Sequence, residues 1–271
     1  MGDNIYKTES RSTAPGVQVG FPRLPKPGSE TQFELVRQWL RDCDKHDLCK
    51  PTRSNSTILP PTRLPTRLID VGTERKSSTI CLHETQIDAD AKYIALSHPW
   101  GDRKEAHFCT TRKSIETHKN GIAVQALPSM FQDAVELTRA LGIRYLWIDS
   151  LCIIQGKDGD FDDEAGRMET VFSTAHCVIA ASNATGNSDK LFTSQRQREC
   201  VKFERENEPP FYICQVIDDF PRDVIRGPLS KRGWVLQERA LARRTIYFGK
   251  NQIYWECGIG VRCETLTRMH K

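Results

Sequence analysis

The sequence predicts an α/β protein with a mainly parallel central sheet and helices on both faces. Two apolar runs, 93–97 and 143–148, have the length and composition of buried strands. Between them, apolar residues recur at helical spacing and form one stripe: Met130, Ala134, Leu137 and Leu141. Gly142 stands where the C-terminal end of a helix favours glycine. A strand, a crossover helix and a second strand imply a parallel pair with a right-handed connection.

The N-terminal part is expected to hold a tail, a helix and two strands. Residues 1–30 have no hydrophobic period and contain four prolines, which predicts a flexible tail. An amphipathic helix is expected from Thr31, because apolar side chains follow helical spacing there: Phe33, Val36, Trp39, Leu40 and Cys43. A connector rich in Pro, Thr and Arg follows over 51–65, and two short strands are expected at 67–71 and 78–83.

Further elements are expected in the C-terminal half. Asp160 is a favourable N-cap for a helix over 160–172. The segment 191–211 is charged and irregular, and the remaining patterns predict a strand at 177–181, a strand at 211–216, a helix at 229–241 and a hairpin whose strands flank 249–251. We therefore expect residues 31–271 to form one domain.

Composition narrows the class of protein. The chain has 39 basic and 35 acidic residues, and this net charge of +4 is too small to predict nucleic-acid binding. We find no apolar run long enough for a membrane span and no secretory signal pattern. Ten cysteines without such a signal predict reduced thiols rather than a disulfide framework. The expectation is a cytoplasmic protein that binds neither nucleic acid nor membranes.

Polar side chains at two strand ends predict one shared cleft. Asp149 and Ser150 end the strand that starts near Tyr145, and Ser97 ends the strand before it. In α/β proteins ligands bind outside the carboxyl ends of the strands. Asp149 could orient a ribose hydroxyl, or it could cap the loop that it begins.

The loop after Ser97 adds candidate ligand contacts. Trp100 could stack on a base or a nicotinamide ring, or pack as a lid over its own core. Gly101 would allow a phosphate to approach the backbone closely. Asp102 closes this loop.

A basic segment near the C-terminus is a candidate anion site. Arg232 and Arg239 are two helical turns apart, so both could point toward one pyrophosphate. The alternative is a solvated helix face that Glu238 balances. Trp234 and Leu236 are expected in the core rather than in contact with a ligand.

Two groups of cysteine and histidine residues leave alternatives open. Cys43, His46 and Cys49 are zinc ligand types, but they supply only three ligands, which Cys81 or Cys109 could complete. A helix-end cluster of buried thiols is the alternative, and no metal site is predicted. Separately, Cys152 could be a nucleophile if the fold brings His98 or His176 near it, but its apolar neighbours favour a packed, inert thiol.

Several segments, in order along the chain, resemble a known family. The chain resembles the HET (heterokaryon incompatibility) domain of filamentous fungi, and the matching segments span about two-thirds of it: 64–72, 93–102, 127–155, 162–182 and 228–249. HET domains are linked to programmed cell death after fusion of genetically different hyphae. They are considered remote relatives of the TIR domain, some members of which cleave NAD.

The resemblance implies a fold and a set of site residues. It implies a TIR-like core over about 90–185 with additions at 31–89, mainly a helix, and at 186–271, mainly a hairpin. Ser97, Gly101 and Asp102 resemble the polar loop after the first TIR strand. The segment from Phe161 to Glu164 resembles the aromatic-x-x-Glu segment that carries the catalytic glutamate of TIR enzymes.

The chain departs from the family pattern at two places. HET domains usually have Trp where this chain has Phe161, and many have Tyr-x-Trp where it has His98-Pro99-Trp100. The resemblance implies that Glu164 stabilises or captures an oxocarbenium-like cation when the ribosyl C–N bond of NAD breaks. Pairing of Glu164 with Arg167 or Lys157 is the structural alternative.

Three functions follow from the residues and the resemblance. The first is a cell-death effector that hydrolyses NAD, as a substrate and not a cofactor, or a related nucleotide. The second is a non-catalytic signalling module that associates with itself or with another incompatibility protein. The third is a hydrolytic or biosynthetic enzyme that depends on Cys152 or His98.

Overall fold

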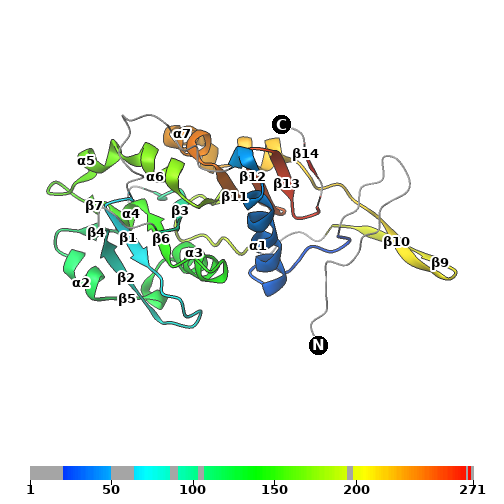
Figure 1. Cartoon of the computed structure of the whole chain (residues 1–271), viewed down its shortest axis with the longest axis horizontal. Helices are drawn as coiled ribbons and strands as arrows, with labels where there is room; N and C mark the ends of the chain where they lie inside the picture. The colour runs from blue at the N-terminus through cyan, green and yellow to red at the C-terminus, as the bar shows by residue number, and fades with distance from the viewer. Residues whose placement is uncertain are drawn as a thin grey trace.

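The computed structural model describes six segments of the chain, which Figure 1 shows in colour: 21–49, 64–85, 91–102, 107–193, 198–266 and 268–269. Most of the predicted N-terminal tail and nearly all of the predicted connector over 51–65 lie outside these residues.

One mixed sheet organises the described residues. Its ten strands follow the order β14-β13-β12-β11-β8-β3-β6-β1-β2-β5. In chain order they are β1 (Arg67–Asp70), β2 (Thr79–Glu84), β3 (Tyr93–Ser97), β5 (Ile122–Ala123), β6 (Tyr145–Ile148), β8 (Cys177–Ala180), β11 (Arg244–Phe248), β12 (Ile253–Cys257), β13 (Gly260–Cys263) and β14 (Arg268–Met269).

The prediction of a mainly parallel sheet holds only for its centre. Strands β6, β3, β8 and β11 are parallel to their neighbours within this group, whereas every other pairing in the sheet is antiparallel. The outer pairs β1–β2, β11–β12 and β12–β13 are joined by short connections, which only antiparallel strands allow. The flanks are therefore antiparallel.

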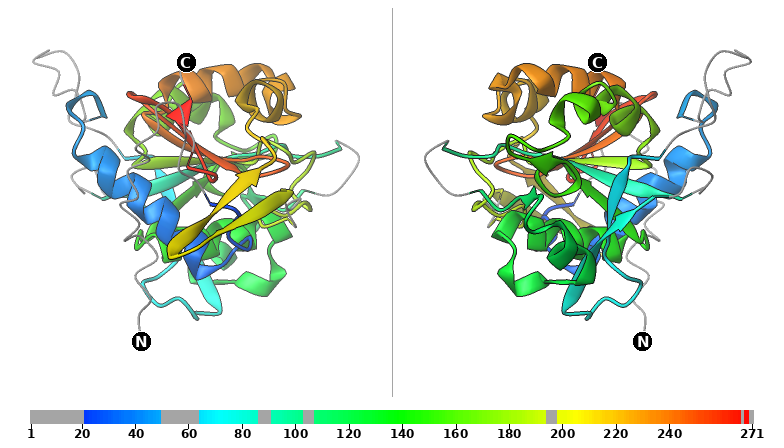
Figure 2. Two further views of the ribbon diagram at one scale, coloured as in Figure 1. Left: turned by 90° about the vertical axis from the view of Figure 1, so that its right-hand side faces the viewer. Right: turned by 90° about the vertical axis from the view of Figure 1, so that its left-hand side faces the viewer.

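Four helices cover the two faces of the sheet, as predicted. Helices α1 (Glu30–Asp44) and α3 (Ser129–Ala140) share one face, where Arg37 Nη1 of α1 donates to the Ala140 carbonyl at 2.8 Å. Helices α6 (Met168–Thr174) and α7 (Gly233–Leu241) contact each other on the opposite face (Figure 2). The connection β3–α3–β6 runs one way across the sheet and β6–α6–β8 runs back. Right-handed crossovers then put their helices on opposite faces.

The smaller elements lie around this framework. They are the helices α2 (Ile115–Asn120), α4 (Asp149–Cys152) and α5 (Phe161–Ala165), the pair β4 (Thr110–Thr111) and β7 (Ile154–Gln155), the pair β9 (Cys200–Arg205) and β10 (Glu208–Cys214), short 3₁₀ turns at Asp47–Cys49, Val124–Ala126 and Leu229–Lys231, and a π-helical turn at Pro221–Ile225.

The order of the central strands locates the ligand edge. In the spatial order β6-β3-β8-β11, β3 comes first along the chain. The chain then moves to β6 on one side of β3 and returns to β8 and β11 on its other side. This is the flavodoxin-like doubly wound order, in which the crevice lies at the carboxyl ends of the two strands where the direction reverses. Those strands are β3, which ends at Ser97, and β8, which ends at Ala180.

The predicted apolar stripes form the core. All five apolar residues predicted for the N-terminal helix are buried, and its Trp39 ring packs 6.3 Å from the Trp255 ring of β12. Along α3, Met130, Ala134 and Leu137 are completely buried. The helix α1 thus docks on strands from the other end of the chain.

Two predictions for the second half of the chain are wrong. The helix expected over 160–172 is two short helices, α5 and α6, separated at Gly166 and Arg167, and Phe161 is 46% exposed instead of buried. The segment 191–211, expected to be irregular, contains β9. This strand pairs with β10 and sets Cys200 opposite Cys214, so that the two form a disulfide.

The disulfide corrects the prediction that all ten cysteines are reduced thiols. It lies in the β9–β10 hairpin, which projects from the body of the molecule (Figure 1), and the other eight cysteines are free. No helix among the described residues is both long enough and apolar enough to span a membrane.

Candidate functional site

A buried serine–carboxylate pair lies where β3 ends. The Ser97 hydroxyl donates a hydrogen bond to the carboxylate of Glu238, which α7 brings over this end of the sheet. Both side chains are buried. Burial raises the pKa of Glu238 to about 7, although the hydrogen bond from Ser97 and the nearby charge of Arg232 act in the opposite direction. Glu238 can therefore hold or release a proton near neutral pH.

The loop after β3 continues this site through a second carboxylate. The indole Nε1 of Trp100 donates to Asp149 Oδ2 at 2.6 Å, and Asp149 Oδ1 lies 3.7 Å from Nδ1 of His98. Asp149 begins α4 directly after β6, and its Oδ1 also accepts from the backbone N–H of Ser150 at 2.7 Å. Asp149 therefore joins the loop after β3 to the end of β6.

His98 is buried without hydrogen-bond partners for its ring. Neither ring nitrogen has a partner of acceptable geometry among the described residues, and the ring packs edge-on against Phe131, 5.1 Å between centroids. Burial lowers its pKa, with Asp149 acting in the opposite direction. A neutral imidazole with two unused nitrogens is unusual in a protein interior, since buried polar groups are normally satisfied.

Arg232 connects this loop to α7. Its guanidinium donates to the backbone carbonyl of His98, and its charge acts on both His98 and Glu238. Six residues from β3, α4 and α7 thus form one site, which we call the strand-end cluster: Ser97, His98, Trp100, Asp149, Arg232 and Glu238.

Arg239 does not join Arg232 as predicted. Its guanidinium contacts Glu256 at 3.1 Å and lies over the Phe220 ring, 5.4 Å from its centroid. Helix α7 begins at Gly233, so Arg232 has an extended backbone and the two-turn spacing on one helix does not apply. The helical spacing that predicted a shared pyrophosphate site is therefore absent from the structure.

The two apolar residues expected in the core of this region are exposed. Trp234 is 56% exposed and Leu236 is 76% exposed, whereas Val235 and Glu238 face the sheet. The inward side of α7 therefore presents a carboxylate where an apolar side chain is usual.

The remaining predicted residues lie at the rim of the strand-end cluster or beside it. Gly101 has a φ of +96°, and its backbone lies so close to Gly186 that a Cβ built on Gly101 is 3.4 Å from the Gly186 Cα. Asp102 follows as an exposed residue. The Ser150 hydroxyl is buried and has no hydrogen-bond partner among the described residues.

Glu164 has a separate set of contacts. Its Oε1 accepts from the Thr66 hydroxyl at 2.7 Å and lies 3.3 Å from Arg167 Nη1. Arg167 Nη1 also donates to Thr66 Oγ1 at 2.7 Å. The carboxylate is buried beneath these partners, so the predicted alternative of pairing with Arg167 describes the contact that the structure contains.

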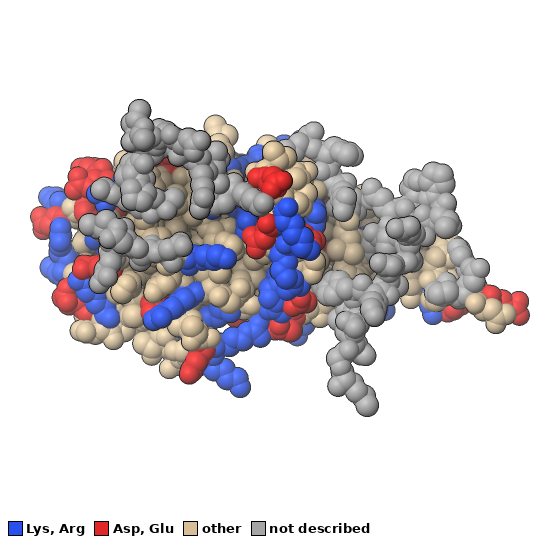
Figure 3. Space-filling model, viewed as in Figure 1, with Lys and Arg blue, Asp and Glu red and all other residues tan. Residues whose placement is uncertain are grey.

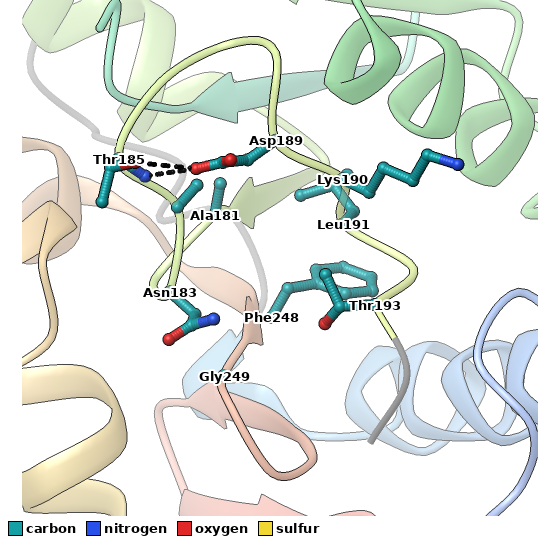
Figure 4. Close-up of a pocket in the computed structure, with 10 residues that line it drawn as sticks. Ala181, Asn183, Thr185, Asp189, Lys190, Leu191, Thr193, Phe248 and Gly249 are labelled. Carbon is teal, nitrogen blue, oxygen red and sulfur yellow. Dashed lines mark hydrogen bonds between the residues drawn. The ribbon is translucent and has the colours of Figure 1, made fainter. Parts of the chain in front are cut away.

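Two cavities open at the carboxyl edge of the sheet. The smaller is about 20 Å³, close to the space of one water molecule, and Ser97, Glu238 and Arg239 are among its lining residues. The larger is about 300 Å³ and is lined by residues that follow β8 and β11, which Figure 4 shows: Ala181, Asn183, Ala184, Thr185, Asp189, Lys190, Leu191, Thr193, Phe248 and Gly249.

The larger cavity has a fixed carboxylate in its wall. Asp189 Oδ2 accepts from the backbone N–H of Thr185 at 2.7 Å and from its hydroxyl at 3.0 Å (Figure 4). Strand side chains alternate between faces. Ala180 and Tyr247 line the smaller cavity and their neighbours Ala181 and Phe248 line the larger one, so the cavities lie on opposite faces of the sheet edge.

Cys152 lacks the features of a nucleophile. Its sulfur is buried, and burial raises its pKa to about 12, which keeps the thiol protonated at neutral pH. His98 has no hydrogen-bond partner among the described residues, and burial lowers the pKa of His176 to about 4. These properties support the interpretation of Cys152 as a packed, inert thiol.

Comparison with known proteins identifies the family. The family model described as "Heterokaryon incompatibility protein (HET)" matches residues 93–238, which is more than half of the chain. The chain belongs to the HET family. The matched region of this HET domain runs from the first residue of β3 to Glu238, so it encloses both partners of the Ser97–Glu238 hydrogen bond.

One relative of this HET domain is a protein of Neurospora crassa named "Heterokaryon incompatibility protein 6, OR allele". The two are 25% identical over 205 residues, which cover 62% of this chain and 30% of the relative. The chain thus spans less than a third of the relative's length. No solved structure matches this HET domain.

Reasoning from the sequence missed two parts of the site. Glu238 was considered only as a charge that balances neighbouring arginines, because apolar residues occur on both sides of α7 and do not show which side faces the sheet. The larger cavity was missed because its walls come from loops after β8 and β11 that carry no recognisable motif.

Proposed function

We propose that this HET domain acts in heterokaryon incompatibility and does so by hydrolysing the N-glycosidic bond of NAD or a related nucleotide. Membership of the HET family and the name of the Neurospora relative support the first part. The Ser97–Glu238 pair at the reversal point of a doubly wound sheet supports the second.

Hydrolysis of the ribosyl C–N bond requires few catalytic groups. Breaking a ribosyl C–N bond gives an oxocarbenium-like transition state, which a nearby carboxylate stabilises or captures. Nicotinamide leaves without a general acid. In a buried site a fixed carboxylate acts more strongly than in water. Glu238 is poised for this role because it is ionised in part at neutral pH, and Asp149 adds a second negative charge nearby.

Two carboxylates compete for the catalytic role. The resemblance to TIR enzymes favours Glu164, whereas the strand-end cluster favours Glu238. Glu164 is already neutralised by Arg167 and bonded to Thr66, which leaves less of its charge for a substrate cation. Glu238 borders a cavity and accepts one neutral hydrogen bond from Ser97. We therefore assign catalysis to Glu238 first.

The decisive experiment measures NAD loss and nicotinamide release by the whole chain and by two matched variants, Glu238→Gln and Glu164→Gln. The cavity beside Ser97 is smaller than a nucleotide, so binding requires a rearrangement that self-association could supply. The assay therefore includes a series of protein concentrations up to the solubility limit.

Loss of turnover in Glu238→Gln alone, by at least about a hundredfold, is the expected result. Loss in Glu164→Gln alone would move catalysis to that residue and retain the hydrolase. Turnover in both variants that equals the turnover of the parent would exclude a catalytic role for either carboxylate. Absence of turnover in the folded parent at every concentration would contradict hydrolysis of NAD.

A second function has its own support. Trp234 and Leu236 of α7 are exposed, and so are Val201 and Ile213 of the β9–β10 hairpin. Exposed apolar side chains that gather on one element often mark an interaction surface. These residues favour a signalling module that associates with itself or with another incompatibility protein. Sedimentation of the parent and of Leu236→Glu tests the self-associating form of this function, which requires self-association in the parent that the substitution abolishes.

A further inference from the structure

Three cysteines and one histidine meet at a junction between the two ends of the described chain. Cys43 lies in the last turn of α1, His46 follows it, Cys49 ends the next 3₁₀ turn and Cys257 ends β12. One ligand atom from each lies within 4.8 Å of the others. We call this group the Cys–His cluster.

The spacing fits a tetrahedral metal site. Zinc binds sulfur at about 2.3 Å and nitrogen at about 2.0–2.1 Å, so tetrahedral ligand atoms are about 3.5–3.8 Å apart. In the Cys–His cluster, His46 Nδ1 lies 3.9 Å from Cys49 Sγ, and the widest separation stays below 4.8 Å. Small rotations of the side chains close the remaining difference.

The fourth ligand distinguishes this group from the pattern visible in the sequence. Cys81 and Cys109, the residues considered as the fourth ligand, are outside the cluster, and Cys257 takes the place instead. All three cysteines of the cluster are buried, and none is in a disulfide. Four protein ligands close a tetrahedral site and leave no position for substrate, which is typical of structural zinc.

A buried arginine supplies the charge that such a site needs. Three thiolates and a neutral imidazole give a zinc complex a net charge of −1. Arg244 of β11 is directly opposite Cys257 in the register, so the two side chains lie on the same face. Arg244 is 5% exposed, and its Nε and Nη1 have no hydrogen-bond partner among the described residues, while Nη2 pairs with Asp44 at 2.7 Å.

The backbone also brings the two segments together closely. Gly258 follows Cys257 in the turn between β12 and β13. A Cβ on Gly258 would lie 3.2 Å from the Leu48 carbonyl oxygen and 3.4 Å from Cys49 Sγ. Glycine at this position lets the β12–β13 turn pack against the 3₁₀ turn that carries Cys49.

We propose that Cys43, His46, Cys49 and Cys257 bind one zinc ion, which joins the C-terminal end of α1 to the β12–β13 turn. Binding displaces the protons of the three thiols, involves no redox change and needs no group outside the cluster. Sulfur and imidazole ligands in tetrahedral arrangement favour zinc over magnesium, calcium and manganese. The site is structural and lies apart from the strand-end cluster.

The test measures metal content in the whole chain, purified without chelators or metal resin. Reduced protein is dialysed against zinc, freed of excess and analysed by elemental mass spectrometry. We expect about one zinc per chain, and a fall of about tenfold or more in Cys257→Ser. Cys81→Ser is the matched control and should keep the full content, because Cys81 lies outside the cluster.

Cobalt provides a second readout that does not depend on the variants folding. Co²⁺ added to the reduced, metal-free parent should give the ligand-field bands of a tetrahedral site and a thiolate charge-transfer band, and one equivalent of Zn²⁺ should remove both. A folded parent without stoichiometric zinc, a disulfide within the cluster that persists after reduction, or octahedral cobalt would overturn the proposal. So would zinc loss in Cys81→Ser with retention in Cys257→Ser.

Discussion

Among the residues of the strand-end cluster, Glu238 shows most directly how burial sets chemistry. Its carboxyl group loses hydration when α7 packs over β3, and this loss outweighs the hydrogen bond from Ser97 and the charge of Arg232. The result is a pKa of about 7 in place of the ordinary 4.5. A group with such a shift in a cleft is a typical functional candidate.

The Glu238 pKa predicts how stability depends on pH. In the folded state Glu238 keeps a proton that the unfolded chain releases above about pH 4.5, so its contribution to stability falls as pH rises toward about 7. Glu238→Gln removes this loss. We expect the variant to gain up to about 3 kcal/mol in free energy of unfolding, relative to the parent, between pH 5 and pH 8.

Urea denaturation of the parent and of Glu238→Gln at both pH values measures this difference directly. Glu169→Gln, an exposed substitution on α6, serves as the control and should show no comparable change. A parent–variant difference that is the same at both pH values would mean that Glu238 titrates normally.

The sequence predicted some of these residues and not others for identifiable reasons. Ser97 and Asp149 follow apolar strands directly, and the rule for α/β sheets locates them. Glu238 comes from a helix whose inward side could not be distinguished, because Trp234 and Leu236 are as apolar as core residues but face solvent. Only the packing of α7 on the sheet shows that Glu238 faces inward while Trp234 and Leu236 face solvent.

Among the elements, α3 has the clearest relation between sequence and structure. Its apolar period places Met130, Ala134 and Leu137 against the sheet, and all three are completely buried. Elements defined by regular periods, such as α1, α3, β3 and β6, were predicted close to their observed positions.

Leu137→Ala should lower the free energy of unfolding by about 2–5 kcal/mol, because it leaves a cavity that the sheet can fill only in part. Glu136→Ala, the exposed neighbour on the same helix, should change it by no more than about 0.5 kcal/mol. Thermal and denaturant unfolding of the two variants give the comparison. Equal losses would mean that α3 packs differently from the structure described.

Other elements were not predictable from local patterns. Asp160 lies at the N-cap position of α5, but its side chain accepts from the Ile154 N–H at 2.8 Å and pairs with Arg67 instead of capping the helix. Strand β9 has charged side chains at three of its six positions and is defined by its pairing with β10. Tertiary contacts that the sequence does not display decide both.

At the scale of the whole molecule, the region matched by the HET family lacks the strands on both edges of its parallel group. Residues 93–238 include three parallel strands but exclude β1, β2 and β11–β13, which cover both edges of that group. They also exclude α1, whose exposed face carries interleaved basic and acidic side chains (Figure 3), including the pairs Arg37–Glu34 and Arg41–Glu34.

A fragment of residues 93–238 should therefore fail to fold cooperatively. Loss of β1 and β11 exposes the edges of β6 and β8, and uncovered apolar edge strands associate with one another. Size-exclusion chromatography and thermal unfolding beside the whole chain measure this. A monomeric fragment with a sharp unfolding transition would show that the flanking strands are dispensable.

The docking of α1 on β12 imposes an order on synthesis. The helix leaves the ribosome well before Trp255 and strand β12, on which Trp39 packs. Until β12 appears, Trp39 lacks the Trp255 ring on which it packs, and closing so long a loop is slow. The nascent chain therefore keeps Trp39 available to chaperones while the residues between α1 and β12 are made. The appearance of β12 is therefore the step that allows α1 to dock.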